Sequence, residues 1–323
     1  NLYNKTRYVV HYTTLQLYLK LGLKLTKIHR VLKFQQQPWL RPYVELCTEN
    51  RKLAKCDFEK DFWKLCVNAV YGKSMENVRR HSNHRLICDE KKALKVIAKP
   101  IFKSFKIINQ DLILAEFMKK SIKLSKPIYT GFTILDISKA VMYEFHYRHI
   151  VPQYGLNATL LFTDTDSLCY EIKTDDLYND MKQDLDSYDT SNFDKDHPLY
   201  SVTNNKVLGK FKSETGSQAP LEFVGLRPKM YSLLVCKKDK AKMTAKGIKR
   251  GFVSKHVRHN QFLKTLQTKI ATKAKFLHFR STNHVIKTLE LEKQCLSAFD
   301  NKRYLLDDGV TSLAYRHYKI PSF

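Results

Sequence analysis

At 323 residues, 43% of them hydrophobic and 12% aromatic, the chain has a globular composition and enough length to bury a sizeable core. Its 57 Lys and Arg residues against 31 Asp and Glu residues give a formal net charge of +26, an excess that an enzyme of small metabolites has no reason to carry. Because a phosphate polyanion rewards such an excess through counterion release, nucleic acid is the favoured partner, and the alternative is a merely basic or ribosomal-type protein.

Seven cysteines are scattered along the chain without any Cys-x-x-Cys pair. This distribution argues against a zinc site and a disulfide framework, and it favours a reducing, intracellular location, the nucleus if the host is eukaryotic. No apolar run approaches the roughly 20 residues that span a bilayer, so no membrane partner is expected. The start at Asn1, without Met or signal-peptide features, favours a fragment whose upstream part is missing.

The first half of the chain predicts mostly helices. Residues 8–12 predict a short strand followed by a Leu-rich helix, and residues 27–34 alternate basic and apolar side chains as a half-buried strand does. Between residues 39 and 72 the pattern predicts two antiparallel helices with a break between 50 and 57. Residues 73–126 are mixed and basic, with short strand candidates at 86–88 and 101–102.

A long amphipathic helix is predicted over residues 127–154. It precedes the stretch LLFTDTDSLCY at 160–170, where two runs of β-favouring residues flank a polar tip, so we expect a hairpin. A polar, acidic surface insertion is expected at 174–200. Strands are expected at 207–211 and 221–236, and a basic, helical region from 237 to about 277.

The hairpin tip carries Asp164 and Asp166. Hard divalent cations such as Mg²⁺ prefer oxygen ligands of this kind, and phosphoryl transfer is often built on them. Asp-x-Asp is also a common pattern that recurs at 184–186 and 194–196, and Asp in a turn often bonds only its own backbone. By itself the hairpin therefore leaves two interpretations open, a Mg²⁺ site and an ordinary Asp-containing turn.

The predicted helix at 58–72 has a polar stripe that suits an incoming nucleotide. At 100° per residue the stripe consists of Lys60, Lys64, Asn68 and Tyr71. The nearly opposite positions are Phe58, Phe62, Leu65 and Ala69, and we expect them to form the packing face. Lysine can hold a triphosphate as a point charge, and Tyr or Asn can lie near the sugar and base. An ordinary solvated face is the alternative.

Two further stretches suit a nucleic acid. The segment LRPKMYSLL at 226–234 is predicted as a strand, on which Lys229 and Tyr231 share one face as a cation and a stacking ring. In TAKGIKRG at 244–251, Lys246 is basic and Gly247 allows the backbone to approach a phosphate closely, although a plain turn explains the glycine equally well.

Taken in chain order, these stretches resemble family B DNA polymerases. Lys64-x-x-x-Asn68-x-x-Tyr71-Gly72 looks like their fingers motif. Phe162-x-Asp164-Thr165-Asp166-Ser167 is similar to their palm carboxylate motif, and Lys229-x-Tyr231 resembles their primer-terminus motif. The likeness extends over most of the chain and is closest to the protein-primed polymerases of phages and other viruses, linear plasmids, organelles and Polinton-type (Maverick) transposable elements.

The resemblance implies an α+β, right-hand polymerase with an antiparallel palm sheet, helical fingers and a mixed, basic thumb. In this family Asp166 would be the main metal-bridging ligand, with Asp164 beside it, and Lys64, Asn68 and Tyr71 would form the nucleotide pocket. Lys52 and Lys60 are further phosphate-binding candidates. Lys229 and Tyr231, with Lys246 and Gly247, would hold the primer end. The implied partners are DNA primer-template, dNTPs and a terminal protein primer, with two Mg²⁺ ions as cofactors.

The implied domains are a palm-proximal segment at 1–37, fingers at 38–72, a palm at 73–236 with insertions at 73–126 and 174–200, and a thumb with a tail at 237–323. Two departures from the family pattern stand out. Ala69 replaces the usual Ser, which removes one hydroxyl, and Phe162 replaces the usual Tyr, which keeps the ring.

Two-metal catalysis needs another carboxylate, which the family supplies from a motif before the fingers. Residues 1–37 contain no Asp or Glu. Asp136, in an apolar-Asp-x-Ser setting, lies after the fingers in a helical context, so we do not expect it to be that ligand, and Asp175 and Asp176 are expected at the surface. The first palm motif and the upstream exonuclease domain are therefore expected to be missing, which leaves this C-terminal part inactive alone.

Two other functions remain open. One is a non-catalytic nucleic-acid-binding remnant of a mobile element, which would bind with a steep salt dependence and no activity. The other is a metal-dependent nuclease, because paired carboxylates with Mg²⁺ can also direct water at a phosphodiester. A nuclease leaves the stripe of Lys64, Asn68 and Tyr71 unexplained.

Overall fold

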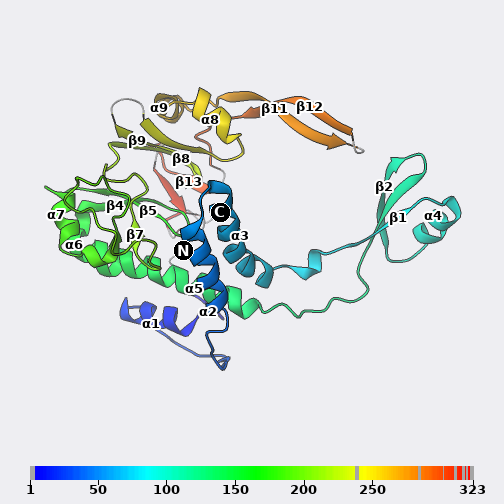
Figure 1. Cartoon of the computed structure of the whole chain (residues 1–323), viewed down its shortest axis with the longest axis horizontal. Coiled ribbons are helices and arrows are strands. Elements are labelled where there is room, and N and C mark those ends of the chain that lie inside the picture. Colours follow the sequence, from blue (N-terminus) through cyan, green and yellow to red (C-terminus); the bar gives the residue numbers. More distant parts are fainter. Residues whose placement is uncertain are drawn as a thin grey trace. The chain divides into compact units, whose positions relative to one another are not determined.

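The computed structural model describes residues 4–236, 240–282, 285–300, 302–308, 311–314, 317, 319 and 320 (Figure 1). The chain is a mixed α+β protein, as expected, and it divides into two compact units. We call Thr6–Asp175 the N-terminal unit and Asp176–Phe323 the C-terminal unit. The strands form several small sheets, nearly all antiparallel, and each lies within a single unit.

The N-terminal unit begins with α1 (Tyr12–Lys20). The predicted strand at 8–12 is wrong, because residues 8–11 have no regular structure and the helix starts at Tyr12. The predicted strand at 27–34 is also wrong, since this segment is irregular and exposed. Alternation of basic and apolar residues marks a strand only where a partner strand is present, and none among the described residues pairs with this segment.

Two antiparallel helices follow, as predicted: α2 (Arg41–Leu53) and α3 (Asp57–Ser74). Pro42 lies in the first turn of α2, where its missing N–H would be unpaired in any residue. At the same end of α2, the Tyr43 hydroxyl donates to the Cys66 carbonyl at 3.1 Å, and the two helices run side by side (Figure 1).

The packing face predicted for α3 is wrong. Phe58 is 79% exposed and Leu65 64% exposed, whereas the half-buried or buried positions form a different stripe. That stripe consists of Trp63, Cys66, Val67, Val70, Tyr71 and Ser74. The difference arises because α3 contacts two helices, α2 and α5, and the stripe between them is the one that is covered.

A small subdomain is inserted after α3. Its elements are β1 (Asn83–Ile87), α4 (Glu90–Ile97), β2 (Phe102–Asn109) and β3 (Leu112–Phe117). The strands form an antiparallel sheet in the order β1-β3-β2, so the strand candidates at 86–88 and 101–102 each overlap a real strand by one or two residues. The subdomain has its own core, made of Ile87, Val96, Ala115 and Phe117.

One carboxylate joins the two ends of this insertion. Glu76 accepts hydrogen bonds from Lys73 at 3.2 Å and from Lys126 at 2.7 Å, and it lies 3.1 Å from His81. The bonds from Lys126 and Lys73 lower the pKa of Glu76 to about 2. The carboxylate is therefore ionised throughout the neutral range and holds both ends of the insertion.

The predicted long helix at 127–154 is confirmed as a continuous helical run with an irregular centre. It consists of α5 (Ile128–Glu144), a π-helical segment η2 (Phe145–Ile150) and α6 (Val151–Tyr154). Near its start, Gly131 faces the end of α3, and a Cβ atom built on it would lie 2.3 Å from Cγ of Met75. A larger residue at position 131 would therefore require the Met75 and Ser74 side chains to move.

The predicted hairpin closes the N-terminal unit as β4 (Ala158–Thr163) and β5 (Leu168–Ile172). These strands pair only with each other among the described residues, so the broader antiparallel sheet expected around them is not present there. Short 3-10 turns lie at Val78–Arg80, Gly155–Asn157 and Leu185–Ser187.

The C-terminal unit begins with α7 (Leu177–Lys182), β6 (Tyr188–Asp189) and β7 (Phe211–Lys212), the last two pairing in parallel. The segment at 174–200 is less superficial than predicted, because Phe193 and Leu199 are buried. The predicted strand at 207–211 is wrong except at Phe211, where β7 begins.

The main sheet of this unit contains β8 (Glu222–Arg227), β9 (Met230–Cys236) and β10 (Lys240–Ala245) in the order β10-β9-β8. Two helices contact it, α8 (Arg250–His256) and α9 (His259–Thr268). Buried residues of all these elements form one core, which includes Val224, Met230, Ala245, Val253 and Phe262.

The C-terminal unit ends in two hairpins. The first, which we call the ribbon, is formed by β11 (Lys273–Thr282) and β12 (Val285–Gln294), and the second by β13 (Arg303–Leu305) and β14 (Ser312–Ala314). The region from 237 to about 277, expected to be helical, is helical among its described residues only in α8 and α9, because β10 spans Lys240–Ala245 and β11 starts at Lys273. Alternating Lys, Phe and His residues fit the pleat of a strand better than a helical stripe.

Candidate active site

The β4–β5 hairpin presents Asp164 and Asp166 in its turn, as predicted. The backbone N–H of Asp164 donates to the Ser167 carbonyl at 3.1 Å, and that of Asp166 donates to the Asp164 carbonyl at 2.7 Å. Thr165 between them has φ +61°, a left-handed conformation that is unusual for a β-branched residue. Asp164 is half-buried and Asp166 is exposed, so the turn offers at least one carboxylate to solvent.

A half-buried pair of rings connects this hairpin to the helical run. Nδ1 of His146, in the π-helical segment, lies 2.9 Å from the Tyr170 hydroxyl of β5, and the two rings stack with centroids 5.8 Å apart. Burial raises the pKa of Tyr170 to about 12, and burial lowers the pKa of His146. Both groups are therefore neutral near pH 7, and they form a neutral hydrogen bond.

The polar stripe of α3 lies in the same unit. Lys64 and Asn68 are exposed and Tyr71 is half-buried. Within the described part of the chain, the Lys64 ammonium has no hydrogen-bond or ion-pair partner. An external anion can therefore bind this ammonium group without an existing ion pair being broken first.

The other two lysine candidates are less distinctive. The Lys60 ammonium contacts Oδ1 of Asp57 at 3.1 Å, an exposed pair one helical turn apart. Lys52 lies in the last turn of α2, where any cation interacts favourably with the helix dipole. Local electrostatics therefore accounts for both residues without a ligand.

Asp136 has a structural role. Its Oδ2 accepts the His11 backbone N–H at 2.7 Å, and its carbonyl accepts the Thr14 hydroxyl at 3.2 Å. The residue is only 3% exposed. It fixes the start of α1 against α5.

The expected surface positions of Asp175 and Asp176 are confirmed. Both are exposed, and the carboxylate of Asp176 caps α7 by accepting the Tyr178 and Asn179 backbone N–H groups at 2.9 and 3.1 Å. Helix capping therefore explains Asp176 without a metal ion.

Carboxylate oxygens are the correct donors for Mg²⁺, and Asp164 and Asp166 lie close in one turn. Among the residues that the structure describes, however, no three His, Cys, Asp or Glu side chains gather into a metal-binding group. The pair therefore matches Mg²⁺ in the kind of donor, and the described residues provide two carboxylates for it.

The primer-terminus candidates belong to the C-terminal unit. The predicted strand at 226–234 is wrong at its centre, because Pro228 and Lys229 form the turn between β8 and β9. Lys229 has φ +60° and is exposed, while Tyr231 is a half-buried strand residue. Proline followed by a left-handed residue is the pattern of a type II turn, so Lys229 projects from the turn and does not share a strand face with Tyr231.

The structure brings the four candidates of this unit together. Thr244 of β10 lies opposite Tyr231, and the Lys246 backbone N–H donates to the Lys229 carbonyl at 3.0 Å. Lys229 and Lys246 are therefore neighbours at one end of the sheet, and both are exposed. Gly247 has φ +95° with open space around it, so a plain turn explains this glycine.

Comparisons with protein-family models, with curated proteins and with solved structures found no match. In the part of the chain that the structure describes, no helix is both long and apolar enough to cross a membrane.

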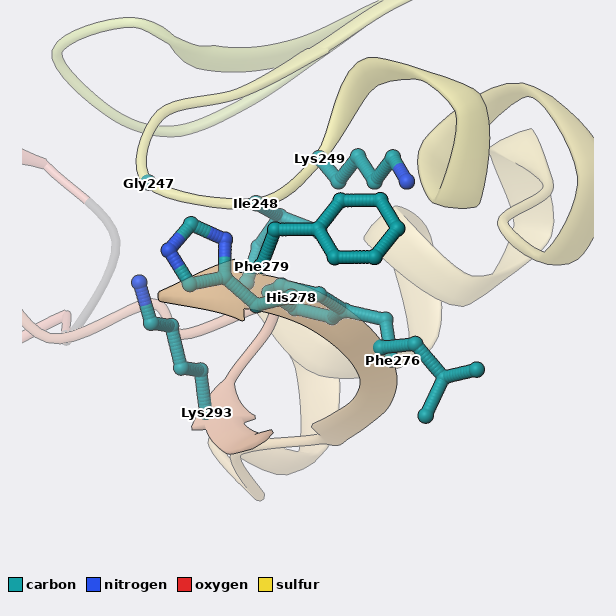
Figure 2. Close-up of a pocket in the computed structure, with 8 residues that line it drawn as sticks. Gly247, Ile248, Lys249, Phe276, His278, Phe279 and Lys293 are labelled. Atoms are coloured by element: carbon teal, nitrogen blue, oxygen red, sulfur yellow. The ribbon is translucent and has the colours of Figure 1, made fainter. Parts of the chain in front are cut away.

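Sequence reasoning missed two features. The contact between His146 and Tyr170 was not predicted, since the residues lie 24 positions apart in different elements. A pocket between the loop at 247–249 and the ribbon was also missed (Figure 2). The alternation in Phe276-Leu277-His278-Phe279-Arg280 was a usable signal for a strand with aromatic and basic side chains.

Proposed function

We propose that this chain is the fingers, palm and thumb part of a family B DNA-directed DNA polymerase of the protein-primed type. One observation carries the proposal. A single compact unit contains both an exposed Lys64-Asn68 stripe on α3 and a hairpin turn that presents Asp164 and Asp166. The helical run from α5 to α6 links the two, since it contacts α3 at Gly131 and the hairpin through His146.

In this proposal α3 belongs to the fingers and the β4–β5 hairpin to the palm. Lys64 binds the triphosphate of the incoming dNTP, and Asn68 and Tyr71 lie near its sugar and base. In the C-terminal unit, Lys229 and Lys246 at the end of the sheet bind the phosphates of the primer strand. Residues from 237 onward form the basic thumb.

Asp166 and Asp164 are the residues of this chain that would hold Mg²⁺. When bound, the metal would stabilise negative charge that develops on the transferred phosphoryl group. The remaining carboxylate is assigned to sequence outside these 323 residues. The chain's own contribution is then to bind and orient the nucleotide and the primer end.

Primer extension tests the proposal. The protein should be the longest polypeptide whose reading frame contains this chain, assayed with primer-template, dNTPs and Mg²⁺. Asp166→Asn should lower the rate of incorporation by at least about a hundredfold, because a metal ligand contributes several kcal/mol, and should leave duplex binding nearly unchanged. Asp196→Asn is the matched control, since it changes an exposed Asp of another Asp-x-Asp sequence and should have no effect.

Equal activity of the Asp166→Asn variant and the unchanged protein would contradict the polymerase assignment. Robust incorporation by the 323-residue chain alone would contradict only the assignment of a ligand outside it.

A second candidate is a non-catalytic nucleic-acid-binding protein. The net charge of +26 and the neighbouring exposed cations Lys229 and Lys246 favour it, because these groups bind phosphate without a metal. This alternative predicts salt-sensitive DNA binding and no incorporation in any form of the protein.

A further inference from the structure

The C-terminal unit contains an open pocket of about 450 Å³ between the loop at 247–249 and the ribbon. Figure 2 shows its side chains reaching in from these two elements. Its lining includes three rings, Phe276, His278 and Phe279, and two cations, Lys249 and Lys293, and none of its lining residues is acidic. The volume is typical of a site for a small molecule or a single nucleotide unit.

The rings of the pocket differ in how firmly they are held. Phe276 is half-buried and packs against the core of the unit, so it forms a fixed wall. Phe279 is 76% exposed and lies three residues further along β11. A phenyl ring that is exposed beside other rings has a free face, and nucleobases of any identity stack on such faces.

The cations of the pocket are available to an anion. Lys293 places its Nζ 5.9 Å from the centroid of the Phe276 ring, and Lys249 is exposed. Elsewhere on the ribbon, Glu292 pairs with Lys273 at 2.6 Å and with Lys275 at 3.7 Å. The ribbon's other acidic residue, Glu290, lies opposite Leu277 in the strand register and is not among the residues that line the pocket.

We propose that the pocket binds an unpaired nucleotide of a single-stranded nucleic acid. The base stacks on Phe279, and the adjoining phosphates contact Lys249 and Lys293, which line the same pocket. This binding needs no metal, primer or dNTP, so it goes beyond the proposed polymerase function and can be tested separately.

Fluorescence anisotropy with the full chain in EDTA tests this site. The probes are a labelled oligothymidylate and the same oligonucleotide with abasic sites in its central part, which has an equal charge but no bases there. We expect the unchanged chain to bind the base-bearing probe about tenfold more tightly, because one stacked base contributes that much. Phe279→Ala should remove this preference, and Phe279→Tyr should retain it.

Two matched controls separate stacking from charge. Phe299→Ala removes a ring of similar exposure, 69% against 76% for Phe279, outside the pocket and should retain the preference for bases. Lys249→Gln should weaken the binding of both probes to the same extent and should reduce the slope of log K against log salt by about one. Lys264→Gln on α9 should have a smaller effect on both quantities.

Retention of the base preference in a folded Phe279→Ala variant, or its absence in the unchanged chain, would overturn the proposal. Tighter binding of polyglutamate than of the oligothymidylate would also overturn it and would identify an acidic peptide as the occupant. None of these outcomes bears on primer extension, so failure of this site and failure of the proposed polymerase function are distinguishable.

Discussion

The two hairpins that carry candidate functional turns, β4–β5 and β8–β9, are supported in different ways. Each turn contains a non-glycine residue with left-handed φ, Thr165 at +61° and Lys229 at +60°. In β8–β9 the strands belong to the core of their unit, where Met230 and Ser232 are 0% exposed. In β4–β5 no residue of the two described strands is buried.

This difference shows that one turn is held by a hydrophobic core and the other by a specific polar contact. The β8–β9 turn is stabilised by the burial of apolar side chains in the core of its unit. Such burial is non-directional and tolerates small changes in geometry. The β4–β5 turn depends on the stacked and hydrogen-bonded pair of His146 and Tyr170. The candidate metal ligands therefore lie on the hairpin whose strands contain no buried residue.

The largest expected effect is that of truncating the core under β8–β9. Met230→Ala should destabilise the C-terminal unit by about 3 kcal/mol, because it leaves a cavity in a fully buried position. Leu160→Ala is the comparison in β4, where the side chain is 37% exposed, and should cost at most about 1 kcal/mol.

Urea unfolding measures both effects, followed by tryptophan fluorescence and by circular dichroism. The chain has two tryptophans, Trp39 and Trp63, and both lie in the N-terminal unit, so tryptophan fluorescence reports on that unit while circular dichroism reports on the whole chain. Equal losses for the two variants would contradict the distinction between the hairpins.

Acid should act next most strongly, and on the C-terminal unit. Burial alone would raise the pKa of Asp189, but hydrogen bonds from Ser191, the Lys206 backbone and Lys212 outweigh it and lower the pKa to about 2. Since the folded pKa lies below the unfolded value, this carboxylate contributes about 1 to 2 kcal/mol above roughly pH 4, and the contribution is lost as the pH falls toward 2.

Asp189→Asn should therefore flatten the acid limb of the stability curve of the C-terminal unit, measured by urea unfolding followed by circular dichroism between those pH values. The control is Asp196→Asn, which changes an exposed carboxylate in the same segment. An unchanged acid limb in the Asp189→Asn variant would show that other carboxylates dominate.

A smaller effect is expected from the polar contact under β4–β5. Tyr170→Phe removes the hydrogen bond to His146 and keeps the ring, so it should destabilise the N-terminal unit by about 1 kcal/mol. Tyr129→Phe is the control, because Tyr129 is 52% exposed and its ring stacks on Phe34 without needing its hydroxyl. If the two variants unfold at the same urea concentration, the His146–Tyr170 bond does not support the hairpin.

The smallest effect is expected from replacing a residue of left-handed φ in a turn by glycine. At Lys229 this change should raise stability and weaken binding. Lys229→Gly should stabilise the C-terminal unit by up to about 1 kcal/mol, since glycine adopts positive φ without strain. The same change removes a cation and should weaken primer-template binding. Lys206→Gly is a matched control, because Lys206 has φ +58° and is exposed.

Both glycine variants should be stabilised in urea, but only Lys229→Gly should show a lower slope of log K against log salt, by about one, in a binding titration. An equal loss of binding in the two variants would assign the effect to general charge.

Local sequence signals predicted the elements that are decided locally. The hairpin at 158–172 follows from two β-favouring runs around an Asp-rich turn, and the α2–α3 pair follows from helical periodicity. Asp164 and Asp166 were correctly predicted to lie in the turn for the same reason.

The errors have a common cause in contacts with distant residues. The alternation at 27–34 predicted a strand, but no strand of the described part of the chain pairs with this segment. The apolar positions Phe58 and Leu65 predicted a packing face on a side of α3 that is exposed. Lys229 was placed on a strand because the turn signal of Pro228 was given too little weight. The His146–Tyr170 contact depends on a packing arrangement that no local pattern encodes.

The bonds of Glu76 make the insertion between α3 and α5 a separable module. Lys73 and Lys126, which are 53 positions apart, both reach this one carboxylate, so the insertion begins and ends at nearly the same point within the N-terminal unit. The subdomain beyond that point has its own core of Ile87, Val96, Ala115 and Phe117. A short linker in its place should close the gap without disturbing α3 or α5, so this is the natural position at which to delete, exchange or graft a domain.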